Sequence, residues 1–124
     1  MKVLIVEDDN VLSLMLSRMV TEMGHQVLNV VTKGQHAIRE ALENKPDIIL
    51  MDIMLDDDTD GIEAYRQIKE QLTIPVIYIT GNSDSLNKRR ANQFGYHDFL
   101  TKPIIFKDLK QSIRLINNKI NQNQ

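Results

Sequence analysis

Acidic, hydroxyl and ammonium side chains follow directly on short apolar runs at four places in the sequence. Glu7 and Asp8 follow the first run, Asp52 and Thr80 end the middle runs, and Lys102 follows the last. Carboxylates that lie close together repel one another, so either one holds a proton or a cation lies among them. Oxygen ligands favour a hard cation, and Mg²⁺ combines carboxylates with waters and phosphate oxygens. The chain therefore carries the groups that a magnesium and phosphate site needs.

One of these carboxylates can also be a nucleophile. Phosphoryl transfer depends mainly on positioning and electrostatic stabilisation, so a carboxylate, a divalent cation and an ammonium group suffice. An aspartate can attack a phosphoryl group and become an aspartyl phosphate, while Lys102 can supply positive charge. Taken singly, Thr80 is an ordinary strand end, Asp52 a turn residue and Lys102 a solvated side chain. Only their joint placement favours a reactive site.

Five short runs of strand character alternate with segments of helical periodicity. We predict strands over Lys2–Val6, Gln26–Val31, Asp47–Met51, Val76–Thr80 and Tyr96–Phe99. Several runs are continuously apolar, which is typical of parallel strands covered by helices on both faces. Successive βα units predict α/β architecture, a flavodoxin-like doubly wound sheet of five parallel strands in order 2-1-3-4-5 with five helices. In that order the reversal falls between the strands that precede Glu7 and Asp52, so both carboxylates reach one ligand-binding edge.

The segments between these strands carry helix signals. Asp9 is placed to cap the first helix rather than to bind metal, and Gly24 stops that helix. Asp60 and Glu63 form a capping-box pattern before the third helix. The segment from Ser83 to Phe94 is weakly apolar, which predicts light packing. The apolar stripe of the first helix is expected at Leu12, Met15, Leu16, Met19 and Met23.

Length and composition favour one globular domain. We expect it to span residues 1–120 of the 124, with a polar tail over 121–124. The formal charge of −2 gives no general attraction to nucleic acid, and Lys88–Arg90 is the only basic run, expected on a solvated helix face. No apolar stretch approaches the roughly 20 residues of a membrane helix. Without cysteines or a signal-peptide core, we expect a cytoplasmic protein that makes no contact with a membrane.

Soft-ligand metals are not indicated, because the chain has no cysteine and its histidines, His25, His36 and His97, are scattered.

Together these motifs resemble the receiver domain of bacterial two-component response regulators over essentially the whole chain. The stretches that carry the resemblance are Val3–Asp9, Pro46–Asp52, Asp60–Gly61, Ile74–Thr80 and Gly95–Pro103. The resemblance implies a phosphorylation-dependent signalling switch rather than an enzyme in the ordinary sense. Its partners would be a histidine kinase or histidine phosphotransfer protein as phosphoryl donor and a downstream protein target.

The resemblance also implies residue roles. Asp52 would be the phosphoacceptor, with Mg²⁺ held by Asp8, Asp52 and the Met54 main-chain carbonyl, and by Glu7 through water. Thr80 would be the switch hydroxyl and Lys102 the phosphoryl-binding lysine. Phe99 would be the aromatic residue that turns inward, and the Lys102–Pro103 peptide bond would be cis. Met54 and Asn82 would flank the phosphoryl group and tune its hydrolysis.

The loop after Asp52 departs from the common pattern of the family. It runs from Ile53 to Gly61, lacks a proline, is one residue longer than usual and contains Asp56, Asp57, Asp58 and Asp60. These aspartates can form a solvated acidic loop, or they can raise the local Mg²⁺ concentration and alter the lifetime of the phosphoryl group. The sequence leaves both alternatives open.

Other functions fit the residues less well. A phosphatase with an aspartyl nucleophile would need a second acid two residues after Asp52, where Met54 stands. A nucleotide or flavin carrier would need a phosphate-binding cluster of glycines, and the five glycines are dispersed. The remaining alternative is a degenerate receiver that acts only as a protein-binding module.

Overall fold

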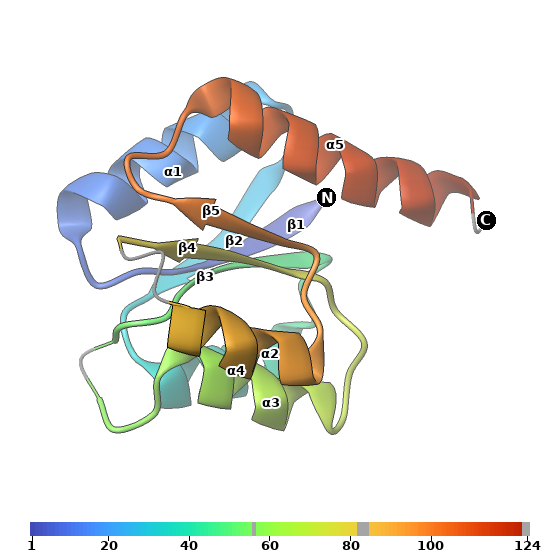
Figure 1. The fold of residues 1–124 in the computed structure, drawn as a ribbon. Helices are drawn as coiled ribbons and strands as arrows, with labels where there is room; N and C mark the ends of the chain where they lie inside the picture. Colours follow the sequence, from blue (N-terminus) through green and yellow to red (C-terminus); the bar gives the residue numbers. More distant parts are fainter. Residues whose placement is uncertain (56, 82–84, 123–124) are drawn as a thin grey trace.

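Short apolar strands and amphipathic helices alternate along the chain and build one parallel sheet between two helical layers (Figure 1). The structure is a computed structural model that describes residues 1–55, 57–81 and 85–122. The described elements, in chain order, are β1 (Lys2–Val6), α1 (Asn10–Glu22), β2 (Gln26–Val31), α2 (Gly34–Asn44), β3 (Ile48–Asp52), α3 (Gly61–Lys69), β4 (Val76–Thr80), α4 (Ser85–Phe94), β5 (Asp98–Thr101) and α5 (Phe106–Gln122).

The strand order is β2-β1-β3-β4-β5, which confirms the predicted doubly wound topology. Successive side chains of a strand point to opposite faces of the sheet, so each continuous apolar run serves two cores. Val3 and Ile5 of β1 pack with α1 and α5, whereas Leu4 and Val6 pack on the face covered by α2, α3 and α4 (Figure 1). The absence of polar alternation in the central strands thus follows from helices on both faces.

Two predicted strands are displaced, one by a single residue and the other by two residues at each end. β3 begins at Ile48 and extends to Asp52, because the parallel ladder with β4 continues to the pair Asp52–Ile79. β5 begins at Asp98 rather than Tyr96, because the chain first leaves α4 through Gly95, whose φ is +76°. Its ladder then runs to Thr101, opposite Thr80. Both shifts carry the ladder further toward the edge where the acids lie.

The structure confirms both predicted ends of the first helix, but one residue of its predicted apolar stripe is exposed. Asp9 accepts hydrogen bonds from the backbone N–H groups of Val11 and Leu12 at 2.9 and 3.1 Å. Gly24 ends the helix with φ +88°. Met15, predicted in the stripe, is 44% exposed. The buried positions are Ser13, Leu16 and Val20, and the other predicted residues of the stripe, Leu12, Met19 and Met23, are partly buried against the same core.

Only half of the capping box of α3 forms. The Asp60 carboxylate accepts from Glu63 N at 2.9 Å. The Glu63 carboxylate accepts from Arg66 and Gln67 instead of turning back to Asp60. At the other end of the chain, α5 continues through Gln122, two residues into the predicted tail. No helix within the described ranges is long and apolar enough to cross a membrane.

Candidate phosphoryl and metal site

Three carboxylates meet where β1 and β3 end. These strands are neighbours in the sheet, so Glu7 and Asp8 after β1 lie beside Asp52 at the end of β3. One carboxylate oxygen from each of the three residues lies within 4.8 Å of the others. Strand order reverses at this point, which is where open parallel sheets bind ligands. The predicted convergence of these acids is therefore present in the structure.

One ammonium group lies among these acids. Lys102 follows β5, and its backbone N–H donates to the Thr80 carbonyl at 2.7 Å. Its Nζ lies 3.2 Å from Asp52 Oδ2 and 3.3 Å from Glu7 Oε2. Burial lowers the pKa of Lys102, but the charges of Asp52 and Glu7 outweigh burial and raise it. Lys102 is therefore cationic, and one positive charge faces three carboxylates.

The surroundings of Glu7 disfavour its ionised form. Burial and then the neighbouring charge of Asp52 raise the pKa of Glu7 to about 7. Glu7 Oε2 is buried and, within the described chain, accepts no hydrogen bond, since its contact with Lys102 Nζ lacks hydrogen-bond geometry. A buried carboxylate oxygen that accepts no hydrogen bond is costly. An all-oxygen donor set with excess negative charge and such an oxygen fits a hard divalent cation such as Mg²⁺.

The remaining predicted residues surround this cluster at different distances. Met54 donates its N–H to Asp52 Oδ1 at 3.3 Å, and its side chain is 67% exposed. Thr80 is buried at the end of β4. Phe99 lies outside the acid cluster, where its ring packs 5.8 Å from that of Tyr96 and Lys88 Nζ lies 5.7 Å from its centroid. The cis peptide bond is present between Lys102 and Pro103.

The sequence and fold of this chain match a known family. Residues 3–114 match the family described as response regulator receiver domain. The chain belongs to the response regulator receiver domain family, whose members serve two-component systems.

Relatives of this receiver domain match it over nearly its whole length. Response regulator ArlR of Staphylococcus aureus is 35% identical over 93% of this chain and 52% of its own, so the chain spans about half the length of such curated relatives. The receiver domain of a modulated diguanylate cyclase from Desulfovibrio desulfuricans is 32% identical with a TM-score of 0.90, covering 99% of this chain and 98% of that domain.

A third relative bears directly on the acid cluster. The receiver domain of sensor histidine kinase PA1611 from Pseudomonas aeruginosa is 32% identical with a TM-score of 0.83, covering 94% of this chain and 97% of that one. Its structure holds a magnesium ion in the active-site cleft. A similar receiver therefore binds the cation that the donor set of this chain fits.

In the acidic loop of this receiver domain, the predicted Asp60 cap is present, and Asp57 makes contacts that were not predicted. Asp57 and Asp60 are not simply solvated, because each carboxylate accepts hydrogen bonds from the start of a helix. Asp60 also pairs with Arg90 of α4 at 2.9 Å. Asp58 is exposed. Asp56 and the predicted tuning residue Asn82 lie outside the described residues.

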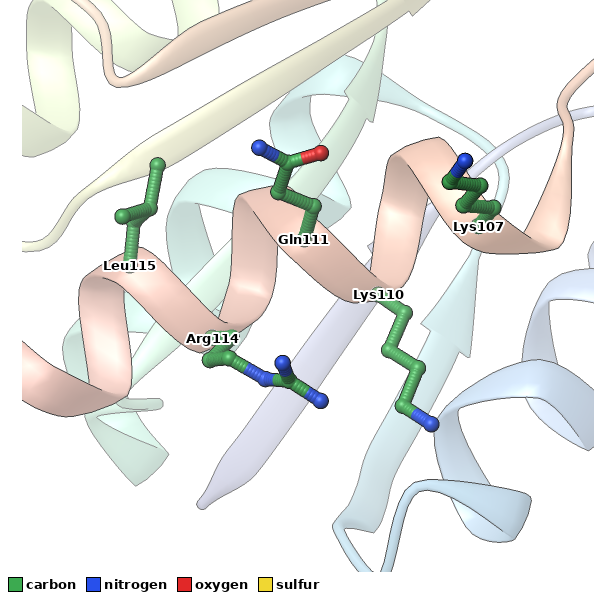
Figure 2. Close-up of a pocket in the computed structure, with 5 residues that line it drawn as sticks. All are labelled: Lys107, Lys110, Gln111, Arg114 and Leu115. Atoms are coloured by element: carbon green, nitrogen blue, oxygen red, sulfur yellow. The ribbon is translucent and has the colours of Figure 1, made fainter.

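A shallow hollow on α5 is a poorer candidate for a site. It has a volume of about 360 Å³ and is lined by Lys107, Lys110, Gln111, Arg114 and Leu115. Figure 2 shows that these side chains point in different directions instead of converging. Ligand sites need polar groups that converge on one point, so the chemistry of this receiver domain belongs to the strand ends.

Proposed function

We propose that this receiver domain is a phosphorylation-controlled switch in which Asp52 accepts the phosphoryl group. The observation that carries the proposal is the meeting of Glu7, Asp8 and Asp52 within 4.8 Å, with Lys102 Nζ 3.2 Å from Asp52. A nucleophile, a cation site and a fixed ammonium group are what phosphoryl transfer requires. Membership of the receiver family supports the same assignment.

The phosphoryl donor is a phosphohistidine on a histidine kinase or a histidine phosphotransfer protein. An Asp52 carboxylate oxygen forms a bond to phosphorus while the phosphorus–nitrogen bond breaks. The electron pair of that bond stays on the imidazole nitrogen, which takes up a proton. Asp8, Asp52 and the Met54 carbonyl would hold Mg²⁺, with Glu7 acting through water. When bound, this cation neutralises charge on the transferring group.

Phosphorylation then changes a protein-binding surface. The phosphoryl group adds nearly two negative charges to the site, beside Lys102 and the end of β4. Lys102 and the Thr80 hydroxyl move toward the phosphoryl oxygens, and Phe99 follows inward. The affected surface comprises α4, β5 and α5, and it binds the downstream target. The light packing of α4, which buries only Ala91, supports this choice of moving element.

Intact-protein mass spectrometry tests the assignment. Incubation with acetyl phosphate or phosphoramidate and Mg²⁺ should add the mass of one phosphoryl group to the wild-type chain and none to Asp52→Asn. Asp9→Asn is the matched control, because Asp9 caps α1 and asparagine is also a good cap. It should be phosphorylated like the wild type.

Two results would contradict the proposal. Phosphorylation of Asp52→Asn at the wild-type rate would exclude Asp52 as the acceptor. A folded wild-type chain that gained no phosphoryl mass from any donor would favour the alternative function, a degenerate receiver that acts only as a binding module.

A further inference from the structure

The loop from Ile53 to Asp60 is bound to a helix far away in the sequence. Helix α2 begins at Gly34, and its own cap residue, Lys33, makes no side-chain hydrogen bond to the first turn. The N–H groups of a first turn need acceptors from outside the helix. Here Asp57 supplies them: its Oδ1 accepts from Gly34 N at 3.0 Å and its Oδ2 from Gln35 N at 3.1 Å. The loop therefore caps α2 in place of the helix's own residue.

A second group of contacts holds the loop in the same position. Gln35 Nε2 donates to Thr59 Oγ1 at 2.7 Å, and Thr59 is buried. A Cβ atom on Gly34 would overlap the Thr59 carbonyl oxygen and lie 2.9 Å from Thr59 Cβ. Glycine at this position thus allows the loop to approach the helix closely. These contacts fix the part of the loop around Asp57 and Thr59 on α2.

The electrostatics of Asp57 agree with this geometry. A carboxylate at a helix N-terminus is stabilised by the helix dipole. Slight burial raises the pKa of Asp57, but hydrogen bonds from Gln35 and Gly34 outweigh burial and lower it. The Asp57 charge is thus engaged by backbone N–H groups of α2, which argues against a general attraction of Mg²⁺ as its main role.

The other end of the loop is fixed next to Asp52. Gly61 N donates to the Ile53 carbonyl at 2.9 Å, and a Cβ atom on Gly61 would overlap the Asp52 carbonyl oxygen. Between these anchors, Met54 is attached by one hydrogen bond to Asp52 Oδ1 and has an exposed side chain. The loop contains no proline to restrict its backbone. After Met54, the next side-chain hydrogen bonds of the described loop residues are those that Asp57 accepts from α2.

We propose that Asp57 is a positioning residue for the cation site: by capping α2 it holds the loop so that the Met54 carbonyl faces the oxygens of Asp8 and Asp52. This inference rests on the proposed function, because it takes the Met54 carbonyl as a ligand. It differs from the hypothesis that the aspartates of the loop act on Mg²⁺ by raising its local concentration. Hydrogen-bond geometry at one aspartate, and not summed negative charge, couples the loop to Mg²⁺.

Three variants of the full chain separate geometry from charge. Asp57→Ala removes both the cap and the charge, Asp57→Asn removes the charge but keeps a capping oxygen, and Asp58→Ala removes an exposed charge from the same loop. Mg²⁺ affinity is measured by isothermal titration calorimetry where circular dichroism shows every variant fully folded. Hydrogen exchange of the Gly34 and Gln35 amides is measured separately without Mg²⁺.

We expect Asp57→Ala to lose roughly tenfold in Mg²⁺ affinity, the lower end of the range for residues that orient metal ligands, and to exchange the two amides faster. Asp57→Asn should retain most of the affinity, and Asp58→Ala should match the wild type. Equal losses in all three variants would show that charge alone acts. Faster exchange in Asp57→Ala with unchanged affinity would show that Asp57 is only a helix cap. Either result overturns the proposal.

Failure of the proposed function would be visible in the same experiment. If the wild-type chain bound no Mg²⁺, the proposed function and the positioning role would fail together. If the wild type bound Mg²⁺ and Asp57→Ala bound it equally well, only the positioning role would fail.

Discussion

Helices α3 and α4 cover the same face of the sheet but are attached to it very differently. α3 buries five of its nine residues, including Ile62, Tyr65 and Ile68. α4 buries one of its ten, Ala91. Since burial of apolar side chains is the main favourable term in folding, α3 is held by the core whereas α4 is held by few contacts. α3 follows the strand that ends on Asp52, and α4 follows the strand that ends on Thr80, so a well-packed helix and a lightly packed one both connect to the site.

The segments next to the two helices show the same contrast. The loop before α3 is fixed by Asp57, Gly61 and the Asp60 cap. Beneath α4, by contrast, the rings of Tyr78, Tyr96 and Phe99 lie about 6 Å apart, and the buried Tyr78 hydroxyl has no hydrogen-bond partner in the described part of the chain. The comparison shows that the segment beside the acid cluster is held by more hydrogen bonds than the segment beneath α4.

The largest difference between the two helices is expected when one apolar side chain is removed from each. Ile68→Ala in α3 should destabilise the protein by about 3 kcal/mol, because Ile68 is fully buried and leaves a cavity. Leu86→Ala in α4 should cost less than about 0.5 kcal/mol, because Leu86 is 58% exposed. Urea denaturation measures both changes, and equal losses would contradict the difference between the helices.

The second test compares two glycines: Gly61, the first residue of α3, and Gly81, which follows β4. Gly61→Ala should destabilise the protein by roughly 2 kcal/mol, because the new Cβ would lie 2.8 Å from Met51 Cγ and overlap the Asp52 carbonyl oxygen. Gly81→Ala should be nearly neutral, since the nearest atom, Lys102 Cδ, would be 3.8 Å away. The measurement is again the urea midpoint. A well-folded Gly61→Ala protein with wild-type stability would show that the loop can retreat from β3.

The features of the fold that follow from the pattern of apolar residues could be predicted from the sequence. The continuous apolar runs predicted buried parallel strands, and the weak pattern before Phe94 predicted the light packing of α4. The site was predictable because topology brings the ends of parallel strands to one edge. Glu7, Asp8, Asp52 and Lys102 needed only correct strand order to be placed together.

The contacts of the loop could not be predicted in this way. Asp57 caps a helix 22 and 23 residues earlier in the chain, and no local pattern pairs these positions. One signal was available: Lys33 is a poor cap, so α2 needed an acceptor from elsewhere. The ends of β3 and β5 were misplaced because ladder hydrogen bonds, not residue preference, decide where a strand stops.

The third test concerns Glu7 in the acid cluster. Glu7 has an ordinary pKa near 4.5 and a folded-state pKa of about 7, raised by burial and by Asp52. The folded chain therefore binds a proton more tightly than the unfolded chain, and metal-free protein loses stability as pH rises from about 4.5 through about 7. Glu7→Gln lacks this loss and should gain roughly 2 kcal/mol over the wild type between pH 5 and pH 8.

Urea denaturation at both pH values in the presence of a chelator measures this difference. Asp9→Asn is the control, because Asp9 lies next to the cluster but caps α1. If the stability difference between wild type and Glu7→Gln were the same at both pH values, Glu7 would ionise normally in the folded chain, and the excess of negative charge in the site would be offset by the protein itself.

The smallest expected effect concerns the ion pair between α4 and the residue that caps α3. Arg90 of α4 lies 2.9 Å from Asp60 Oδ2, while Asp60 Oδ1 keeps its cap hydrogen bond to α3. Arg90→Gln removes the ion pair and leaves the cap. Because both side chains are about one third exposed, the pair should contribute less than about 1 kcal/mol to stability, and salt should weaken it.

Local opening should nevertheless change, because few contacts hold α4. We expect amide hydrogen exchange in α4 to become several-fold faster in Arg90→Gln, with α3 unchanged. Arg89→Gln removes a neighbouring exposed charge and is the control. The Lys69 side chain, which binds the Phe94 carbonyl at the far end of α4, remains in both variants. If Arg90→Gln accelerated exchange equally in α3 and α4, the two helices would open as one unit, and α4 could not move independently of the loop that precedes α3.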